Sequence, residues 1–314
     1  MKNSSIFIIW LKQTRANFLL LAVFLNAIGI GLAYKYLPAG SHLFIADIVL
    51  IVLGTLAAHA SVNLFNEYSD YKSGIDFQTD RTPFNGGSGM LTSGLTKPSA
   101  VLAAAIGTLL FSLGIGIYYS FASNWFLFLI IGIGVFSIVG YTDILAKYLL
   151  GELFAGLALG SLVVIGTFIA LTGTAQLSIS QLIPPEVWLL SIPPGILTAL
   201  LLFLNEFPDL EADQNGGRNH LLIRFGREAG AYIYSAGAIL TYLIILVLPL
   251  LEISSYWVYI ALIPLPLVVK NISTTLRYNS DIPNLVPALG GNVITVLATD
   301  LLIAGSLLLA ILWV

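Results

Sequence analysis

The stretch FLFLIIGIGVFSIVG, residues 126–140, is an unbroken apolar run. A strand of a membrane barrel would alternate apolar and polar residues, so this run indicates a helix inside a bilayer. The composition agrees, because 58% of the 314 residues are hydrophobic and only 9% are charged, whereas soluble domains carry about 25% charged residues. We therefore expect an all-α, polytopic membrane helix bundle.

Similar apolar runs, bounded by polar residues or by Gly and Pro, recur along the chain. A bilayer-spanning helix needs about 20 residues, so nine spans leave only short connections and no separate soluble domain. We expect one integral membrane domain over residues 1–314, with loops on the cytoplasmic side covering a central cavity. The nine expected spans are residues 16–36, 43–65, 99–121, 124–142, 151–172, 187–204, 229–251, 256–272 and 291–314.

With nine spans, the basic residues fall almost entirely on one side of the membrane. Only Lys35 lies on the opposite side. The positive-inside rule makes the basic side cytoplasmic, and we expect the plasma membrane of a prokaryote. The segment before the first span is expected to form a short interfacial helix anchored by Trp10. The side that holds the N-terminus carries Lys2, Lys12, Arg15, Lys72, Arg81, Lys97, Lys147, Arg218, Arg224, Arg227, Lys270 and Arg277.

Two helix ends on that side carry the same acidic motif. They read NLFNEYSDYKSGID at residues 63–76 and LLFLNEFPDLEAD at residues 201–213. Both contain Asn-Glu-x-x-Asp, and both continue to a further carboxylate. This weak internal repeat predicts two pseudo-symmetric helical halves that present matching acidic ends to one site. The residues concerned are Asn66, Asp70 and Asp76 in the first motif and Asn205, Asp209 and Asp213 in the second.

The spacing of the motifs gives them a geometry. Residues four apart share a helix face, which is the spacing of Asn66 and Asp70. Asp76 lies about 240° further around a helix than Asp70, so a turn at Gly74 must bring it back. The same face extends inward to His59, which we expect to be a hydrogen-bonded packing residue.

The motifs predict a cation site of oxygen ligands. The chain has no Cys, and carboxylate and amide oxygens with little His nearby suit Mg²⁺ or Ca²⁺ better than Zn²⁺. Two acidic ends that face each other repel one another unless divalent cations lie between them. Acidic ends, Mg²⁺ and a diphosphate therefore form a self-consistent arrangement of charge.

Basic residues next to the motifs would complete such a site. Arg81, Lys147 and Arg218 lie on the same side, where cations stabilise a leaving diphosphate. Taken singly, residues such as Arg81 and Lys147 are more often membrane-face anchors than ligands. The loop NGGSG, residues 85–89, offers backbone N–H groups to phosphate.

Other charged residues receive simpler interpretations. Arg15, Arg224 and Arg227 are expected to be membrane-face anchors. Asp300 is unusual because it falls within the last expected span, where an ionised carboxylate costs about 2.5 to 3.5 kcal/mol. It is expected to face the cavity, to be protonated or to pair within the bundle.

These motifs resemble those of the UbiA superfamily of intramembrane prenyltransferases. The matching stretches are NEYSDYKSGID with DRTP, then YTDILAKYLLGELFAGLALG, then NEFPDLEADQNGGRNHLLIRFG. The resemblance covers nearly the whole chain and is strongest to the branch that prenylates 1,4-dihydroxy-2-naphthoate. Three positions differ from the common pattern of the family: Glu67, the pair Arg15-Ala16, and the triplet Arg218-Asn219-His220.

The resemblance implies a cofactor, two substrates and a set of site residues. The cofactor is Mg²⁺, and the substrates are a polyprenyl diphosphate and an aromatic acceptor drawn from or near the lipid bilayer. No nucleic acid is expected, and protein partners are left open. The implied metal ligands are Asn66, Asp70, Asp76, Asp209 and Asp213. The implied substrate-binding residues are Asn66, Arg81, Lys147, Tyr141, Asn205 and Arg218. The implied catalytic residues are Asp70, Asp209 and Lys147.

The expected reaction is transfer of the polyprenyl group to an electron-rich aromatic ring. An apolar helix bundle keeps water away from the allylic cation, and Tyr68, Tyr141 and Tyr148 are candidates to stabilise it. The expected acceptor is a naphthoate, with a hydroxybenzoate, homogentisate, a glycerol lipid or a porphyrin as the alternatives. Two other classes are weighed. A secondary transporter needs carboxylates deep in its spans, which only Asp300 provides, and a CDP-alcohol phosphotransferase needs an Asp-Gly-x-x-Ala-Arg start that the sequence lacks.

Overall fold

Long helices form wherever the sequence is continuously apolar, because backbone N–H and C=O groups in a bilayer must pair within the segment. The structure is a computed structural model that describes residues 5–38, 40–79, 81–82, 84–141, 144–175 and 177–313. Lys2 and the last residues of the expected spans 124–142 and 291–314 lie outside the described residues. The helices are α1 (Ile6–Gln13), α2 (Leu19–Tyr36), α3 (Ile45–Ser73), α4 (Pro98–Ala122), α5 (Phe126–Gly140), α6 (Gly151–Gly156), α7 (Leu162–Thr172), α8 (Ile179–Leu182), α9 (Pro185–Asn215), α10 (Leu221–Leu250), α11 (Leu265–Tyr278) and α12 (Ile282–Leu312).

The expected all-α membrane-type bundle is confirmed. Among the described residues, 7 helices are long and apolar enough to cross a membrane. An eighth crossing is formed if the 3₁₀ helix Tyr256–Leu262 and α11, which meet at a bend of 41°, count as one span. The remaining expected span corresponds to α5, a shorter apolar helix of 15 residues. The count of nine spans therefore stays a prediction.

Several helices continue beyond the apolar runs that predicted them. At 1.5 Å per residue, the 31 residues of α9 extend over about 46 Å, compared with about 30 Å for the hydrocarbon core of a bilayer. α3 likewise runs on to Ser73. Both acidic motifs therefore lie on helical turns that project past the apolar part of the bundle.

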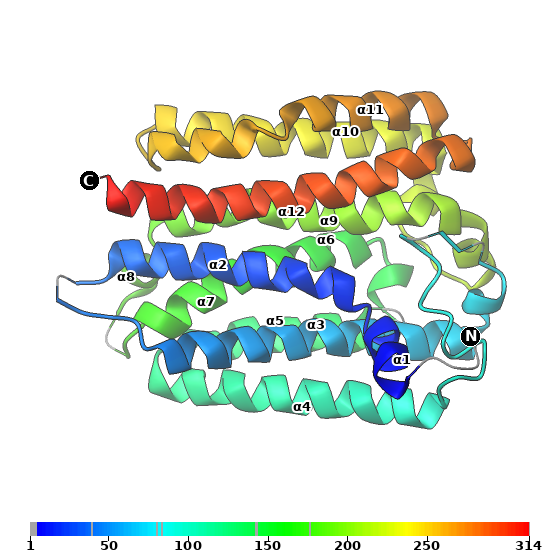
Figure 1. Ribbon diagram of the computed structural model, residues 1–314, viewed down its shortest axis with the longest axis horizontal. Coiled ribbons are helices and arrows are strands. Elements are labelled where there is room, and N and C mark those ends of the chain that lie inside the picture. Colours follow the sequence, from blue (N-terminus) through cyan, green and yellow to red (C-terminus); the bar gives the residue numbers. More distant parts are fainter. Residues whose placement is uncertain are drawn as a thin grey trace.

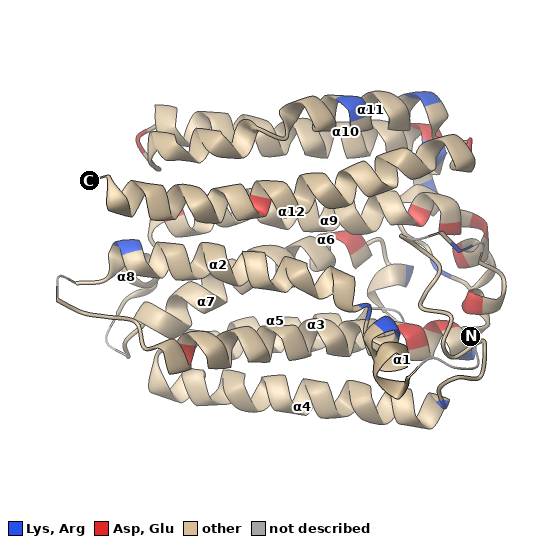
Figure 2. Ribbon diagram, viewed as in Figure 1, with Lys and Arg blue, Asp and Glu red and all other residues tan. Residues whose placement is uncertain are grey.

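The helices pack side by side, and α1 lies at the opposite end of the bundle from the last turn of α12 (Figure 1). α3 packs against α4, α9 against α10, and α2 against both α7 and α12. The main buried cluster, which includes Leu25, Val164, Leu197 and Ile303, joins α2, α7, α9 and α12. Acidic and basic residues gather mostly at one end of this bundle (Figure 2), the end that carries both motifs.

Candidate functional site

The first motif closes on itself through a glycine turn. α3 carries Asn66 and Asp70 and ends at Ser73. Gly74 follows at φ +85°, a left-handed conformation that favours glycine, and the 3₁₀ helix Ile75–Phe77 comes next. The turn returns Asp76 to the cavity that Asp70 also lines. The predicted role of Gly74 is therefore confirmed.

The second motif lies on the last turns of α9. Asn205, Asp209 and Asp213 are four residues apart on a continuous helix that ends at Asn215. Gly217, at φ +79°, then reverses the chain before His220, which caps α10. Arg218 sits in this short connection and is carried back over the motif that precedes it.

Both motifs line one cavity of about 710 Å³, which we call the acidic cavity. It brings together helix ends that are separated by more than a hundred residues, as the repeat predicted. The roles of the motif residues in binding metal and substrate stay a prediction. Of the predicted site residues, the acidic cavity is lined by Asn66, Asp70, Asp76, Tyr141, Asn205, Asp209, Asp213 and Arg218.

Arg218 connects the two motifs directly. Its guanidinium group donates to Asp213 Oδ1 at 2.7 Å and to Asn66 Oδ1 at 3.3 Å, and it forms an ion pair with Asp70. The side chain is only 13% exposed. Burial by itself would lower the pKa of Arg218, but the Asp70 and Asp213 carboxylates raise it above its usual value. Arg218 is therefore a fixed positive charge between two acidic helix ends.

Two other basic residues predicted for the site, Arg81 and Lys147, lie outside the acidic cavity. Arg81 is exposed and uses its guanidinium to hold the loop after the first motif, donating to the Gly86 carbonyl at 2.7 Å and the Asp76 carbonyl at 3.1 Å. Lys147 is exposed, at the end of the 3₁₀ helix Leu145–Lys147. Neither is among the residues that line the acidic cavity, so their contact with substrate stays a prediction.

Arg15 is in the site, contrary to the anchoring role expected for it. It lines the acidic cavity and pairs with the buried Glu67, with 3.3 Å between Nε and Oε1. Gln13 donates to the other oxygen of Glu67 at 2.9 Å, and the Ser88 hydroxyl donates to it at 2.7 Å. Glu67 therefore binds the segment before α2 and the loop after α3 to the first motif. A basic residue just before the first span was the only sequence signal of this.

The NGGSG loop, residues 85–89, contacts carboxylates of both motifs. Asn85 donates from its side-chain amide to Asp209, and the Ser88 backbone N–H donates to Glu67. Gly87 has φ +68°, and a Cβ atom there would lie 2.7 Å from Asp76 Oδ1. Only glycine allows the backbone to approach the carboxylates so closely. The loop covers the acidic cavity, and Asn85 is a site residue that the sequence indicated only as part of a glycine-rich stretch.

The acidic cavity leads into two further cavities, one after the other, that are mainly apolar. A second cavity of about 820 Å³, the junction cavity, shares Asn66, Tyr141 and Asn205 with it. His59 lines both the junction cavity and a third cavity of about 920 Å³, the apolar cavity. His59 is buried, and its Nε2 has no hydrogen-bond partner among the described residues, so the expected hydrogen bond is not observed there.

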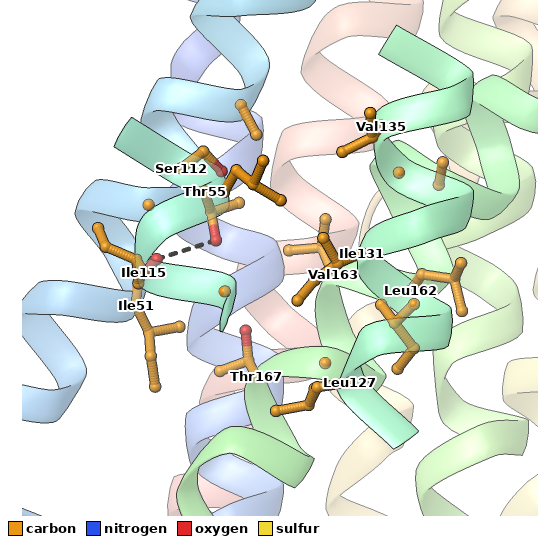
Figure 3. Close-up of a pocket in the computed structure, with 18 of the residues that line it drawn as sticks. Ile51, Thr55, Ser112, Ile115, Leu127, Ile131, Val135, Leu162, Val163 and Thr167 are labelled. Carbon is orange, nitrogen blue, oxygen red and sulfur yellow. Dashed lines mark hydrogen bonds between the residues drawn. The ribbon is translucent and has the colours of Figure 1, made fainter. Parts of the chain in front are cut away.

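The apolar cavity is lined mainly by aliphatic side chains (Figure 3). Leu127, Ile131 and Leu162 are examples. The hydroxyl groups of Thr55 and Thr167, which also line it, both donate to Asn26 Oδ1, at 3.3 and 2.9 Å. These polar groups are therefore satisfied within the protein, and the cavity suits a hydrocarbon ligand.

Aromatic side chains face the junction between the polar and apolar space. Tyr141 and Phe84 line both the acidic and the junction cavities. Tyr68 packs against the cluster of Leu64, and Tyr148 is 69% exposed. Of the three tyrosines considered, only Tyr141 lines these cavities.

The donor set fits a divalent cation. Asp70 and Asp76 are buried, and Asp76 Oδ2 has no hydrogen-bond partner among the described residues. Burial, followed by the Glu67 and Asp70 carboxylates, raises the pKa of Asp76 to about 7. A cation between these oxygens would remove that repulsion, and oxygen-only ligands favour Mg²⁺.

Asp300 lies apart from this site. It is fully buried in α12, and neither of its carboxylate oxygens has a hydrogen-bond partner among the described residues. It is not among the residues that line the acidic, junction or apolar cavities. The expectations that Asp300 faces the cavity or pairs are therefore not met in the described part of the chain.

Comparisons with known proteins agree with this geometry. The sequence model of the UbiA prenyltransferase family matches residues 27–286. The 1,4-dihydroxy-2-naphthoate octaprenyltransferase of Bacillus subtilis is 28% identical over 264 residues, which are 82% of this chain and 79% of that protein. The protein of the same name from Haemophilus influenzae is 29% identical over 271 residues, 80% of this chain and 85% of that one. A solved UbiA homolog from Archaeoglobus fulgidus, bound to DMAPP and Mg²⁺, has a similar fold, with a TM-score of 0.56 and 17% identity over 94% of this chain and 98% of that chain.

Proposed function

This chain belongs to the UbiA prenyltransferase family, and we propose that it transfers a polyprenyl group from a polyprenyl diphosphate to a quinone-type aromatic acceptor. The observation that carries this proposal is the meeting of two acidic helix ends at a cavity that adjoins apolar space. A diphosphate needs the polar part, and its prenyl chain needs the apolar part.

The acidic cavity provides the diphosphate site. Asn66, Asp70 and Asp76 from one helix end and Asp209 and Asp213 from the other would hold Mg²⁺. When bound, Mg²⁺ neutralises charge on the diphosphate and makes it a better leaving group. The homolog from Archaeoglobus fulgidus, whose structure contains DMAPP and Mg²⁺, supports this proposal. Asn205 lines the acidic cavity and adds an amide to it.

The protein's own side chains act on the leaving group and on the cation. Arg218 places a permanent positive charge in the acidic cavity, where the diphosphate gains charge as its bond to the allylic carbon breaks. Tyr141 and Phe84 present aromatic faces at the junction, where the electron-poor allylic carbon lies. A ring carbon of the acceptor then forms the new bond and loses its proton or its carboxyl group.

The walls of the junction and apolar cavities keep water from the reaction. Water would trap the allylic cation as an alcohol, so a water-poor site is a requirement of the chemistry. Aliphatic side chains dominate the apolar cavity, which receives the prenyl chain. Arg81 and Lys147 are proposed to contact the diphosphate from the exposed rim, a role that requires movement of Lys147 or of the loop that Arg81 holds.

The acceptor is proposed to be 1,4-dihydroxy-2-naphthoate or a close analogue. The names of the Bacillus subtilis and Haemophilus influenzae relatives support this choice. Hydroxybenzoate, homogentisate and non-quinone acceptors are the alternatives within the family. A secondary transporter is not favoured, because the carboxylates of the site lie at one end of the bundle (Figure 2) rather than near its middle.

The membrane arrangement is part of the same proposal. We propose nine spans, with α5 and the bent pair as full crossings, in one domain over residues 1–314. The positions of α1 and of the last turn of α12 at opposite ends of the bundle support an odd number of crossings. The acidic motifs and the N-terminus are proposed to face the cytoplasm of a prokaryotic cell.

A direct assay tests the proposed reaction. The purified protein in detergent is incubated with radiolabelled geranylgeranyl diphosphate, a panel of aromatic acceptors, and either Mg²⁺ or EDTA. We expect a lipid-soluble prenylated product with 1,4-dihydroxy-2-naphthoate and Mg²⁺, and none with EDTA. Product with another acceptor alone would correct the substrate, and release of neither product nor diphosphate with any acceptor would contradict the proposed function.

A further inference from the structure

Three buried ligating side chains lie together at the second motif, which includes Glu206. Glu152 is in the first turn of α6, Glu206 is on α9, and His220 caps α10. Glu206 and His220 also line the acidic cavity. Their exposed fractions are 3%, 6% and 2%. One ligating atom from each lies within 4.8 Å of those of the other two. The motif residues assigned to Mg²⁺ above include none of the three.

Two carboxylate oxygens of this group lack a donor. Glu152 Oε1 accepts the Leu221 backbone N–H at 2.8 Å, but Glu152 Oε2 has no hydrogen-bond partner among the described residues. The same is true of Glu206 Oε2, whose neighbour is His220 Nδ1 at 3.4 Å. His220 Nδ1 accepts the Ile223 backbone N–H at a long 3.4 Å, a bond that an ion on this nitrogen would replace. A buried carboxylate oxygen without a partner is costly, so both atoms indicate a positively charged ligand.

Carboxylates outnumber cations around the acidic cavity. The guanidinium groups of Arg15 and Arg218 face a larger number of carboxylates, and the diphosphate adds further negative charge. Buried carboxylates that approach one another in this way are stable only with counter-ions or bound protons. Besides Glu152 and Glu206, the carboxylates are those of Glu67, Asp70, Asp76, Asp209 and Asp213.

The chemistry of this group differs from that of the acidic motifs. An imidazole nitrogen with two carboxylates suits Mn²⁺, Fe²⁺ or Zn²⁺, whereas oxygen-only sites suit Mg²⁺. Three ligand atoms that share one ion, with bonds of about 2.0–2.2 Å, lie about 3.0–3.6 Å from one another. His220 Nδ1 and Glu206 Oε2, 3.4 Å apart, already meet this spacing, and the 4.8 Å limit on the other separations means that Glu152 has to move closer by up to about 1 Å.

We propose that Glu152, Glu206 and His220 form a second divalent-cation site, which takes a transition-type ion such as Mn²⁺ and lies beside the Mg²⁺ site of the acidic motifs. The ion joins α6, α9 and the connection that carries Arg218. His220 Nε2 lies 3.2 Å from Asp213 Oδ2, so the site also orients a carboxylate of the second motif. Its role is to hold Arg218 and Asp213 in place and to offset buried negative charge.

Metal retention tests this proposal. The purified full-length protein is stripped with EDTA, loaded with Mn²⁺ and dialysed against a large excess of Mg²⁺, which occupies the oxygen-only site. We expect one Mn²⁺ per chain to remain by elemental analysis, and electron paramagnetic resonance to show its coupling to an imidazole nitrogen. His220→Gln should remove the coupling and Glu152→Gln the retained ion, while His42→Gln, an exposed histidine, should change neither.

The outcomes separate this site from the proposed function. No retained Mn²⁺, or retained Mn²⁺ without nitrogen coupling in the unmodified protein, would overturn the proposal, even if the variants fold poorly. Protonated glutamates would then account for the buried carboxylates. Retained and nitrogen-coupled Mn²⁺ in a protein that transfers no prenyl group would instead leave the site intact and remove the proposed function.

Discussion

Arg218 is the residue that ties the two acidic motifs together, through Asp70, Asn66 and Asp213. Removing one partner of a buried ion pair leaves the other charge uncompensated, at a cost of about 3–5 kcal/mol. We predict that Arg218→Gln lowers the thermal midpoint of the metal-free protein and that added Mg²⁺ restores more stability to the variant than to the unmodified protein. Thermal unfolding with and without Mg²⁺ measures this.

Arg227→Gln is a matched control for that variant. Arg227 pairs with the exposed Glu211, with 3.4 Å between Nη1 and Oε1, so its loss should not change the response to Mg²⁺. An Arg218→Gln protein whose midpoint and Mg²⁺ response equal those of the unmodified protein would show that Arg218 does not balance the charge of the motifs.

Gly87 places the covering loop against the carboxylates. In Gly87→Ala the new methyl group would lie 2.7 Å from Asp76 Oδ1 and 3.1 Å from Glu67 Oε1. We expect the Mg²⁺ concentration for half-maximal activity to rise about tenfold or more, as about 1.4 kcal/mol of lost binding requires. Gly94→Ala is the control, because Gly94 has φ +69° with no neighbouring atom within 4 Å. Gly94→Ala introduces the same backbone strain as Gly87→Ala, about 1–2 kcal/mol, but no clash with a carboxylate. Equal effects of the two variants on the Mg²⁺ requirement would contradict the role of Gly87 in placing the loop.

Individual residues of the site were predictable where their spacing fixed them. Asn66 and Asp70 follow from helical periodicity, and Asp76 follows from the turn at Gly74. The contacts of Arg81 and Arg15 did not follow, because a long side chain reaches in any direction and its target is set by tertiary packing. Arg81 holds a loop, and Arg15 reaches the cavity. From the sequence, Arg15 was expected to be a membrane-face anchor, and Arg81 either an anchor or a ligand of the diphosphate.

The elements around the apolar cavity set the space for the prenyl chain. Gly166 lies on α7 and lines this cavity, and its nearest neighbour to an added Cβ is Ile130 Cγ2, at 3.6 Å. A leucine there would displace roughly two methylene groups of a long substrate, each worth about 0.8 kcal/mol. We predict that Gly166→Leu lowers kcat/KM for a long-chain diphosphate about tenfold relative to a short-chain one.

Paired kinetics with geranyl diphosphate and a long-chain polyprenyl diphosphate measure this ratio. Gly107→Leu is the control, because Gly107 is an exposed residue of α4 with no atom within 4 Å of an added Cβ. If Gly166→Leu reduces both substrates equally, the prenyl chain does not occupy the apolar cavity.

The helices themselves were largely predictable, but their ends were not. Hydropathy located the apolar part of each helix, as in the expected span 187–204. It did not show that α9 begins at Pro185 and continues to Asn215, because the projecting turns are polar and are held by contacts with the loops. The left-handed Gly226 that breaks the helical geometry within α10 also has no hydropathy signal.

In the protein as a whole, protons and metal ions compete for the carboxylates of the acidic cavity. Burial, and then the Glu67 and Asp70 carboxylates, raises the pKa of Asp76 to about 7. Below that pH the carboxyl group of the metal-free protein holds a proton, which must leave before a cation binds. We predict that the apparent affinity for Mg²⁺ falls with decreasing pH, by up to about tenfold per unit below pH 7.

Mg²⁺ titrations of activity at several pH values, with a stability control at each, measure this dependence. An affinity for Mg²⁺ that is constant across pH 7, or that increases as pH falls, would contradict a role for Asp76 as a ligand with a raised pKa.

The arrangement of the helices was partly predictable from the sequence, because membrane-spanning helices show clear apolar runs and charged residues gather outside them. The gathering of charge at one end of the bundle follows from the sequence (Figure 2), as does the pairing of two helix ends. The buried group of Glu152, Glu206 and His220 does not, since its members come from three elements brought together only by packing. The crossing count rests on a short helix and a bent pair, which composition alone does not resolve.

The most direct test of the central claim is prenyl transfer by Asp70→Asn and Asp209→Asn proteins, compared with Glu211→Gln. Glu211 lies on the same end of α9 as Asp209, but its side chain is 81% exposed. With Mg²⁺ present, each aspartate variant should lose about 100-fold or more of the activity, as expected when a charge-stabilising group is removed, and Glu211→Gln should keep it. Full activity in either aspartate variant, in protein that purifies normally, would contradict a shared site built from two acidic helix ends.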